Sequence, residues 1–151
     1  MAAAVVTRLA FGKTDVVQML NGCIGGLVAI TAEPLMPSPL AAILIGAVGG
    51  VIVVYGTKFL LSLKIDDVVG AIPAHLFAGI WGTLAVPITN PDTSFGTQLL
   101  GVVSINVFVF AVSFVIWFLM KNTFGIRLSK EGELKGTDVT ETGVIAYAIR
   151  D

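Results

Sequence analysis

Charged side chains are scarce in this chain. Only 13% of its 151 residues are Asp, Glu, Lys or Arg, whereas 56% are hydrophobic, and the mean hydropathy is +0.94. A water-soluble domain carries about a quarter charged residues, so the composition excludes an ordinary soluble domain. Four long stretches have no charged residue at all: 16–32, 34–55, 68–91 and 93–120.

These uncharged stretches predict membrane-spanning helices. A helix needs about 20 largely apolar residues to cross the hydrocarbon core, and about 17 is the lower limit. The last three stretches exceed that length, and the first is short but rich in glycine. We therefore predict an all-α polytopic membrane protein with four transmembrane helices, at about 14–32, 38–62, 67–89 and 95–122.

Cysteine is almost absent, and the N-terminal segment is too short to span a membrane. The single cysteine, Cys23, excludes an intrachain disulfide, and we interpret it as a small packing residue. In residues 1–11 the charge follows the apolar part, whereas a signal peptide has it before. We interpret this segment as the end of a truncated transmembrane helix, and residues 126–151 as a C-terminal tail.

The basic residues all fall on one side of the predicted helices. None occurs in the connections 33–39 and 90–95, which carry Glu33 and Asp92 instead. Because Lys and Arg are enriched in cytoplasmic segments, we predict that these two connections lie outside the cytoplasm. The tail is then cytoplasmic.

Two pairs of glycines predict close packing of the helices. Gly22 and Gly26 have the small-xxx-small spacing, and so do Gly46 and Gly50. This spacing lets two membrane helices approach closely. The alternative explanation is that glycine is simply common in membrane helices.

The acidic pair Asp66-Asp67 directly precedes the third predicted helix. A carboxylate at a helix start accepts backbone N–H bonds, and the helix dipole favours its charge there. We expect structural capping, and direct binding of a cation is the alternative.

One histidine, His75, interrupts the third apolar stretch, and the chain has no other. A polar side chain is expensive in hydrocarbon, so a membrane histidine indicates either a functional site or a hydrogen bond to a neighbouring helix. On an α-helix its neighbours three and four positions away share its face. Most are small, which suits a close contact or a narrow lumen: Ala71, Ile72, Ala78 and Gly79, with Gly82 one turn further.

Pro73 lies two residues before His75 and should bend the helix. It has no backbone N–H, which would leave the carbonyl of Val69 without its helical partner. Such freed backbone is tolerated where protein or water in a cavity satisfies it. A polar group beside a bend favours a functional histidine over a purely structural one.

Other chemistry has little support in the sequence. No second histidine or clustered carboxylate accompanies His75 in the apolar stretches, so neither a metal site nor a cofactor is predicted. Nucleophilic catalysis would need a serine near His75. Ser104 and Ser113 lie on the next predicted helix, where serines usually bond to a helix backbone. We predict that the chain is not an enzyme.

Two motifs resemble the Amt/Mep/Rh family of ammonium transporters. The run Lys64-Ile65-Asp66-Asp67, followed by His75 and by Gly79-Ile80-Trp81-Gly82, is similar to the segment around the family's second pore histidine. Asn21-Gly22 with residues 26–32 resembles an earlier family helix. The motifs occur in the family's order.

A third motif lies in the tail. Gly136, Asp138, Gly143 and Tyr147 resemble the family's cytoplasmic C-terminal motif, which implies a regulatory role. Thr142 departs from the pattern, because a histidine is common there in the family. With this motif the resemblance covers nearly the whole chain.

The resemblance implies a fold, an assembly and partners. The family fold has eleven membrane helices, ten of them in two inverted halves around a pore, and this chain matches its C-terminal part. Family members are homotrimers with one pore per subunit in the cell (inner or plasma) membrane. Some are blocked by PII-class signalling proteins at the cytoplasmic face. No nucleic-acid partner is implied.

The resemblance also implies residue roles. His75 corresponds to the second of twin histidines that bond to each other in a hydrophobic conduit and take part in deprotonating ammonium or relaying its proton. Asp66 and Asp67 correspond to a pair that we interpret as structural, near the cytoplasmic mouth. The implied pore-wall positions are Ile24, Thr31, Ala71 and Ile72.

The predicted function is transport of ammonium or ammonia by the complete protein, to which this chain supplies one histidine of the pair. An apolar wall would penalise a permanent ion far more than ammonia. The alternative is a short, non-transporting membrane scaffold or regulatory subunit that assembles with full-length relatives.

Overall fold

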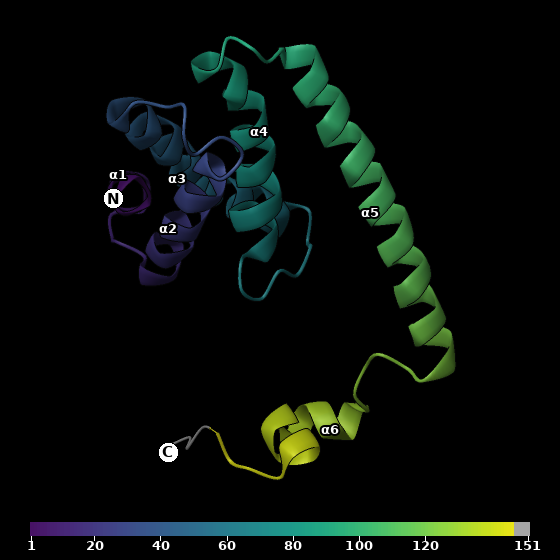
Figure 1. The fold of residues 1–151 in the computed structure, drawn as a ribbon. Helices are drawn as coiled ribbons and strands as arrows, with labels where there is room; N and C mark the ends of the chain where they lie inside the picture. Colours follow the sequence, from purple (N-terminus) through teal and green to yellow (C-terminus); the bar gives the residue numbers. More distant parts are fainter. Residues whose placement is uncertain (147–151) are drawn as a thin grey trace. The chain divides into compact units, whose positions relative to one another are not determined.

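A computed structural model describes residues 1–146, and within that range every regular element is helical (Figure 1). The prediction of an all-α chain is therefore confirmed. The elements are α1 (Ala2–Phe11), α2 (Val16–Ile30), α3 (Pro39–Ser62), the π-helix η1 (Ile72–Phe77), α4 (Ala78–Thr89), α5 (Phe95–Thr123), α6 (Lys130–Lys135) and the π-helix η2 (Asp138–Thr142).

Three helical segments of the described chain are long and apolar enough to cross a membrane: Pro39–Ser62, Ile72–Thr89 and Phe95–Thr123. The segment expected at 14–32 is the 15-residue helix α2, which is below the lower limit of about 17. It is short because the Asp15 side chain caps its start by accepting from the backbone N–H of Gln18, and it ends at Thr31.

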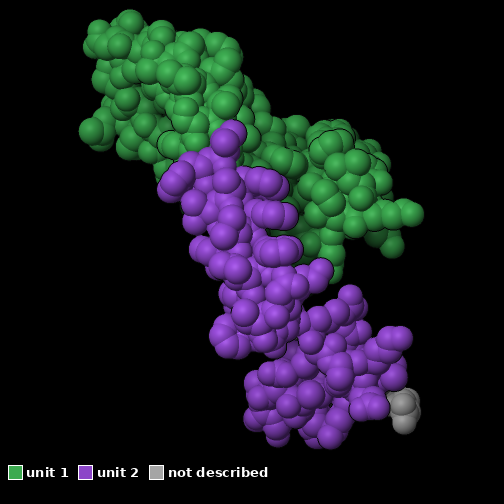
Figure 2. Space-filling view, turned by 90° about the vertical axis from the view of Figure 1, so that its right-hand side faces the viewer, with its two compact units in different colours: residues 1–106 green, residues 107–151 purple. Residues whose placement is uncertain are grey.

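The chain divides into two compact units, residues 1–106 and 107–151, coloured separately in Figure 2. The first unit contains α1 to α4 and the beginning of α5. The second contains the remainder of α5 and the tail.

Helices α2 and α3 pack together through glycine. A Cβ atom added to Gly26 would lie 3.1 Å from the carbonyl oxygen of Gly46, and one added to Gly46 would lie 3.3 Å from the oxygen of Gly26. Gly22 faces Gly50 on α3 and Ala3 on α1 in the same way. The close contact predicted from the glycine spacing is confirmed, with backbone packed directly on backbone.

Helix α4 packs on α2 and α3 around a small apolar core. Ala29, Ile45 and Ala85 form this cluster, and Trp81 packs against it. The indole N–H of Trp81 donates to the carbonyl oxygen of Ile45 at 3.0 Å, so its one polar group is satisfied. Gly82 contacts the backbone of Ala29 so closely that no side chain would fit there.

The two connections without basic residues are joined by a hydrogen bond. The Asn90 amide donates to Glu33 Oε2 at 3.0 Å, and its oxygen accepts from the backbone N–H of Asp92 at 3.0 Å. These contacts hold the α2–α3 connection against the end of α4.

In the second unit, α5 carries a row of stacked aromatic rings, and the tail folds on itself. Phe110, Phe114 and Phe118 stack in succession with ring centroids 6.3 Å apart. Arg127 Nε donates to Glu133 Oε1 at 2.7 Å. This hydrogen bond, aided by the opposite charge, lowers the pKa of Glu133 and raises that of Arg127.

Candidate functional site around His75

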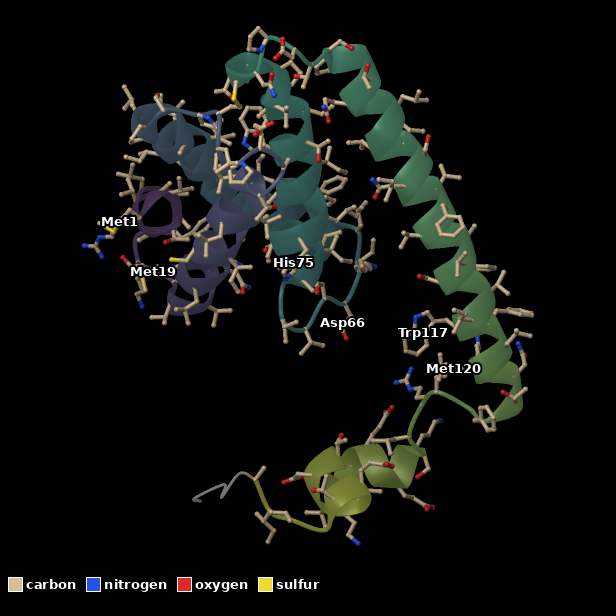
Figure 3. The ribbon with its side chains drawn as sticks, viewed as in Figure 1. Met1, Met19, Asp66, His75, Trp117 and Met120 are labelled. Atoms are coloured by element: carbon tan, nitrogen blue, oxygen red, sulfur yellow. The ribbon has the colours of Figure 1, made fainter. Side chains whose placement is uncertain are left out.

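The helix that carries His75 begins with a carboxylate cap. Asp67 Oδ1 accepts from the backbone N–H of Ala71 and Oδ2 from that of Ile72, both at 2.9 Å. The expected capping role is therefore confirmed for Asp67. Asp66 lies in the loop that leads to this helix (Figure 3).

Pro73 stands in the first turn of the helix, where its missing N–H has little cost. The first four N–H groups of a helix have no partner within it. Two of them bond to Asp67, Pro73 has none, and Ala74 N–H donates to the Gly70 carbonyl at 3.2 Å. The expectation of a helix over 67–89 bent by Pro73 is thus wrong at its start, because the helical residues begin only after Gly70.

The carbonyl of Val69 has a partner on another helix. It precedes the first helical turn and accepts from the Asn21 amide of α2 at 2.8 Å. Between this carbonyl and the helix, Gly70 adopts a left-handed backbone conformation with φ of 73°. A Cβ atom at Gly70 would collide with the Asn21 amide nitrogen.

The π-helical geometry of Ile72–Phe77 changes which residues share a face with His75. A π-turn holds one residue more than an α-turn, so the α-helical spacing assumed from the sequence does not apply. Gly79 lies with His75, whereas Ala78 and Gly82 are buried, with Gly82 against α2. The expected face of small residues is therefore divided between two sides of the helix.

His75 is exposed and lines a groove of about 340 Å³ in the first unit. Most of the lining is apolar, and the polar members besides His75 are Thr83, Gln98 and Asn106. The Asn106 amide nitrogen already donates to the Val102 carbonyl at 2.8 Å. The full lining consists of His75, Leu76, Gly79, Ile80, Thr83, Gln98, Gly101, Val102, Ile105 and Asn106.

A single exposed imidazole in an apolar groove suits a polar solute that passes through a membrane. In a comparison with known proteins, the model of the Ammonium Transporter Family matches residues 1–147. The chain belongs to this family. As a family of transporters, it also agrees with the prediction that the chain is not an enzyme.

Named relatives show the same relationship at the level of sequence. The chain is 34% identical to ammonium transporter Amt2 of Archaeoglobus fulgidus over 97% of its own length, and 37% identical to Amt1 of Haloferax mediterranei, also over 97%. It is 40% identical to a putative ammonium transporter of Synechocystis over 87%. The chain covers 36%, 30% and 30% of these relatives, so it spans about a third of the length of the relatives that it matches.

The pore-wall residues predicted from the family lie outside the groove. Thr31 ends α2, and its hydroxyl donates to the Val28 carbonyl at 2.8 Å. Ile24 is in the middle of α2 with 41% of its surface exposed. Ala71 and Ile72 are at the helix start, where their N–H groups bond to Asp67.

Three polar groove residues were not singled out in the sequence analysis. Thr83 lies eight residues after His75, and a search for polar residues within the third apolar stretch would have found it. Gln98 and Asn106 are polar residues within the last apolar stretch, and this rarity is the signal that could have identified them.

The C-terminal family motif forms a compact turn. Gly136 and Gly143 have positive φ values of 103° and 68°, which favour glycine. Asp138 Oδ2 accepts from the backbone N–H of Ala146 at 2.9 Å. Tyr147, the last motif residue, lies outside the described residues.

Proposed function

We propose that the transporter containing this chain conducts ammonium or ammonia through a hydrophobic pore, and that His75 belongs to a histidine pair in that pore. Family membership supports the substrate. The observation that carries the proposal is the placement of the chain's one histidine in a mostly apolar groove. The second histidine would come from a part of the transporter beyond this chain.

The chemistry of the groove fits this role. A neutral imidazole has one N–H donor and one acceptor nitrogen, so it can replace water around ammonium and accept its proton. The apolar lining offers a permanent cation no comparable replacement for its hydration shell, and such a cation is therefore excluded.

The predicted wall residues lie outside the groove but belong to the start of the His75 helix or to α2, which packs beside that helix. Asn21 bonds to the turn before the His75 helix, and a Cβ at Gly79 would lie 3.6 Å from Val28. Ile24 lies between Asn21 and Val28 on α2 and therefore close to the face toward His75. We include Ile24, Thr31, Ala71 and Ile72 in the wall on this register and on the family resemblance.

The same proposal includes an orientation and an assembly. The distribution of basic residues supports a cell-membrane protein whose C-terminal tail is cytoplasmic. The family resemblance supports a homotrimer. It also supports a PII-class protein as a partner at the cytoplasmic face, a regulatory role for the tail residues Gly136, Asp138, Gly143 and Tyr147, and a place at the cytoplasmic mouth for Asp66 and Asp67.

Replacement of His75 tests the function. In the complete transporter, reconstituted in vesicles, His75→Ala should reduce the initial rate of ammonium uptake per transporter by about tenfold or more, because a positioned proton acceptor contributes at least that much. Ser104→Ala, on α5 outside the groove, is the matched control. Unchanged uptake and selectivity in His75→Ala would exclude His75 as a pore residue.

The alternative of a short scaffold or regulatory subunit is tested by the mass of the native polypeptide. An antibody against residues 130–151 should detect a band at about three times 15.8 kDa, because the chain covers 30–36% of its relatives. A native product of 15.8 kDa would favour the scaffold over transport.

A further inference from the structure

The turn before the His75 helix is tied to α2 by one side chain. Asn21 Nδ2 donates to the Val69 carbonyl at 2.8 Å, across 48 residues of sequence. Within the described residues, no other side-chain hydrogen bond joins α2 to the segment 66–89. This bond is therefore the directional link between the two segments.

The turn is built around the Asn21 amide. Gly70 has φ of 73°, and the amide nitrogen occupies the space that a Cβ at Gly70 would need. The turn's neighbouring N–H groups already have local partners, because Asp67 accepts from Ala71 and Ile72. The Asn21 side chain thus contributes nothing to helix capping and acts only on the position of the turn.

Near its start, the remaining contacts of this helix with its neighbours are apolar, and its hydrogen bond from Trp81 to the Ile45 carbonyl of α3 lies six residues after His75. A Cβ atom at Gly56 of α3 would lie 2.7 Å from the Phe77 ring and 3.0 Å from Pro73, so these two residues rest on α3. Ala78 packs near Gly25 of α2. Apolar contacts have no preferred direction, whereas a hydrogen bond weakens steeply when its angle changes. At the start of the helix, before His75, the Asn21 bond is therefore the directional contact that sets the register.

We propose that Asn21 is a positioning residue for His75. By holding the Val69 carbonyl, it fixes the height of the His75 imidazole along the groove, five residues after Gly70. The inference rests on the proposed function, since His75 must act on ammonium for its position to affect transport.

Two substitutions of Asn21 and one on the same helix test this role. Asn21→Ala removes the amide, and the nearly isosteric Asn21→Asp places an oxygen against the Val69 carbonyl. Gln18→Ala is the matched control, because the Gln18 amide lies one turn earlier and accepts from the Thr57 hydroxyl of α3 at 3.4 Å. All are made in the complete transporter, and ammonium uptake is measured per folded molecule.

Both Asn21 variants should lower the maximal rate about fivefold or more, because a misplacement of about 1 Å is enough to remove much of the effect of a positioned group. They should also displace the pH profile of uptake and change the half-saturating ammonium concentration less than the maximal rate. Gln18→Ala should retain the wild-type profile.

Two outcomes would contradict the proposed role of Asn21. Asn21 variants with a wild-type maximal rate and pH profile, or with the same changes as Gln18→Ala, would overturn the positioning role. If Asn21→Ala does not fold, Asn21→Asp decides, and a wild-type rate for that variant would reduce Asn21 to a packing residue. His75→Ala in the same assay separates the two proposals: its inactivity beside fully active Asn21 variants rejects only the role of Asn21, whereas its full activity rejects the pore histidine itself.

Discussion

Gly70 is constrained both by its backbone and by its surroundings. Its φ of 73° is costly for a residue with a side chain, and a Cβ would meet the Asn21 amide. Gly12 has nearly the same φ, 74°, but no atom within 4 Å of its added Cβ. A comparison of alanine substitutions at the two glycines therefore separates the free-energy cost of the left-handed backbone from the cost of a steric clash with Asn21.

We expect Gly70→Ala to destabilise the protein more than Gly12→Ala. A left-handed conformation costs an alanine about 1–2 kcal/mol at either position, and at Gly70 the displaced Asn21 bond adds about 1 kcal/mol. Thermal unfolding of the two purified variants, followed by circular dichroism, measures the difference. Equal losses of stability would show that the Asn21 contact is absent.

At the scale of single residues, the sequence predicted contacts between residues that are close together along the chain. The cap by Asp67 could be expected because the two backbone N–H donors from which its carboxylate accepts lie four and five residues ahead on the same chain. The partner of the Val69 carbonyl could not, since Asn21 is 48 residues away and the contact requires the packed α2. The sequence predicted that His75 lies in an apolar helix, but it could not predict the contact that supports the start of that helix.

Among the helices, the α2–α3 contact depends on a row of glycines. A Cβ at Gly49 would lie 2.7 Å from the Gly25 carbonyl oxygen and 2.8 Å from the Ala29 Cβ. Both neighbours belong to α2, which also packs on α4. Any increase in the α2–α3 distance would therefore disturb the base on which the His75 helix rests.

Gly49→Ala should destabilise the protein by about 1–3 kcal/mol, because rigid backbone surrounds the added methyl group. Gly96→Ala, at the start of α5 with no atom near its Cβ, should be neutral or slightly stabilising, since alanine favours helix. Urea or thermal unfolding of both variants in detergent compares them. If the two alanines had equal effects, the tight α2–α3 contact would be contradicted.

Helix packing could be predicted from the glycine spacing because both partners keep a regular α-helical period. The face of His75 could not, because a π-turn at Ile72–Phe77 interrupts that period. No residue pattern in the sequence predicted the π-turn. Uniform α-helical spacing therefore predicted that Ala78 and Gly82 lie beside His75, whereas both are buried.

For the whole molecule, composition and charge were sufficient to predict a helical membrane protein, and the family motifs predicted a member of the ammonium transporters. The groove was harder to predict, because Gln98 and Asn106 come from α5, a separate helix from that of His75. As with Asn21 and Val69, contacts between residues far apart in the sequence could not be predicted.

The proposed orientation makes the α4–α5 connection and the C-terminal tail accessible from opposite sides of the membrane. In a complete transporter whose native cysteines, Cys23 among them, are replaced by serine, a single cysteine introduced at Ser94 should react with a membrane-impermeant maleimide added to intact cells. A cysteine at Ser129 should react only after permeabilisation, because it follows the basic end of α5. Labelling of Ser129→Cys in intact cells would reverse the orientation.

The hydrogen bond from Trp81 to Ile45 makes the packing beside His75 optically visible. The chain has two tryptophans, and Trp117 on α5 is 57% exposed. After Trp117→Phe, the fluorescence of this chain would come from an indole that is held between α3 and α4 by its own N–H. Its emission wavelength would then shift to the red whenever those helices separate and water reaches the ring. Trp81 would thus serve as an intrinsic fluorescent probe of movements around the groove.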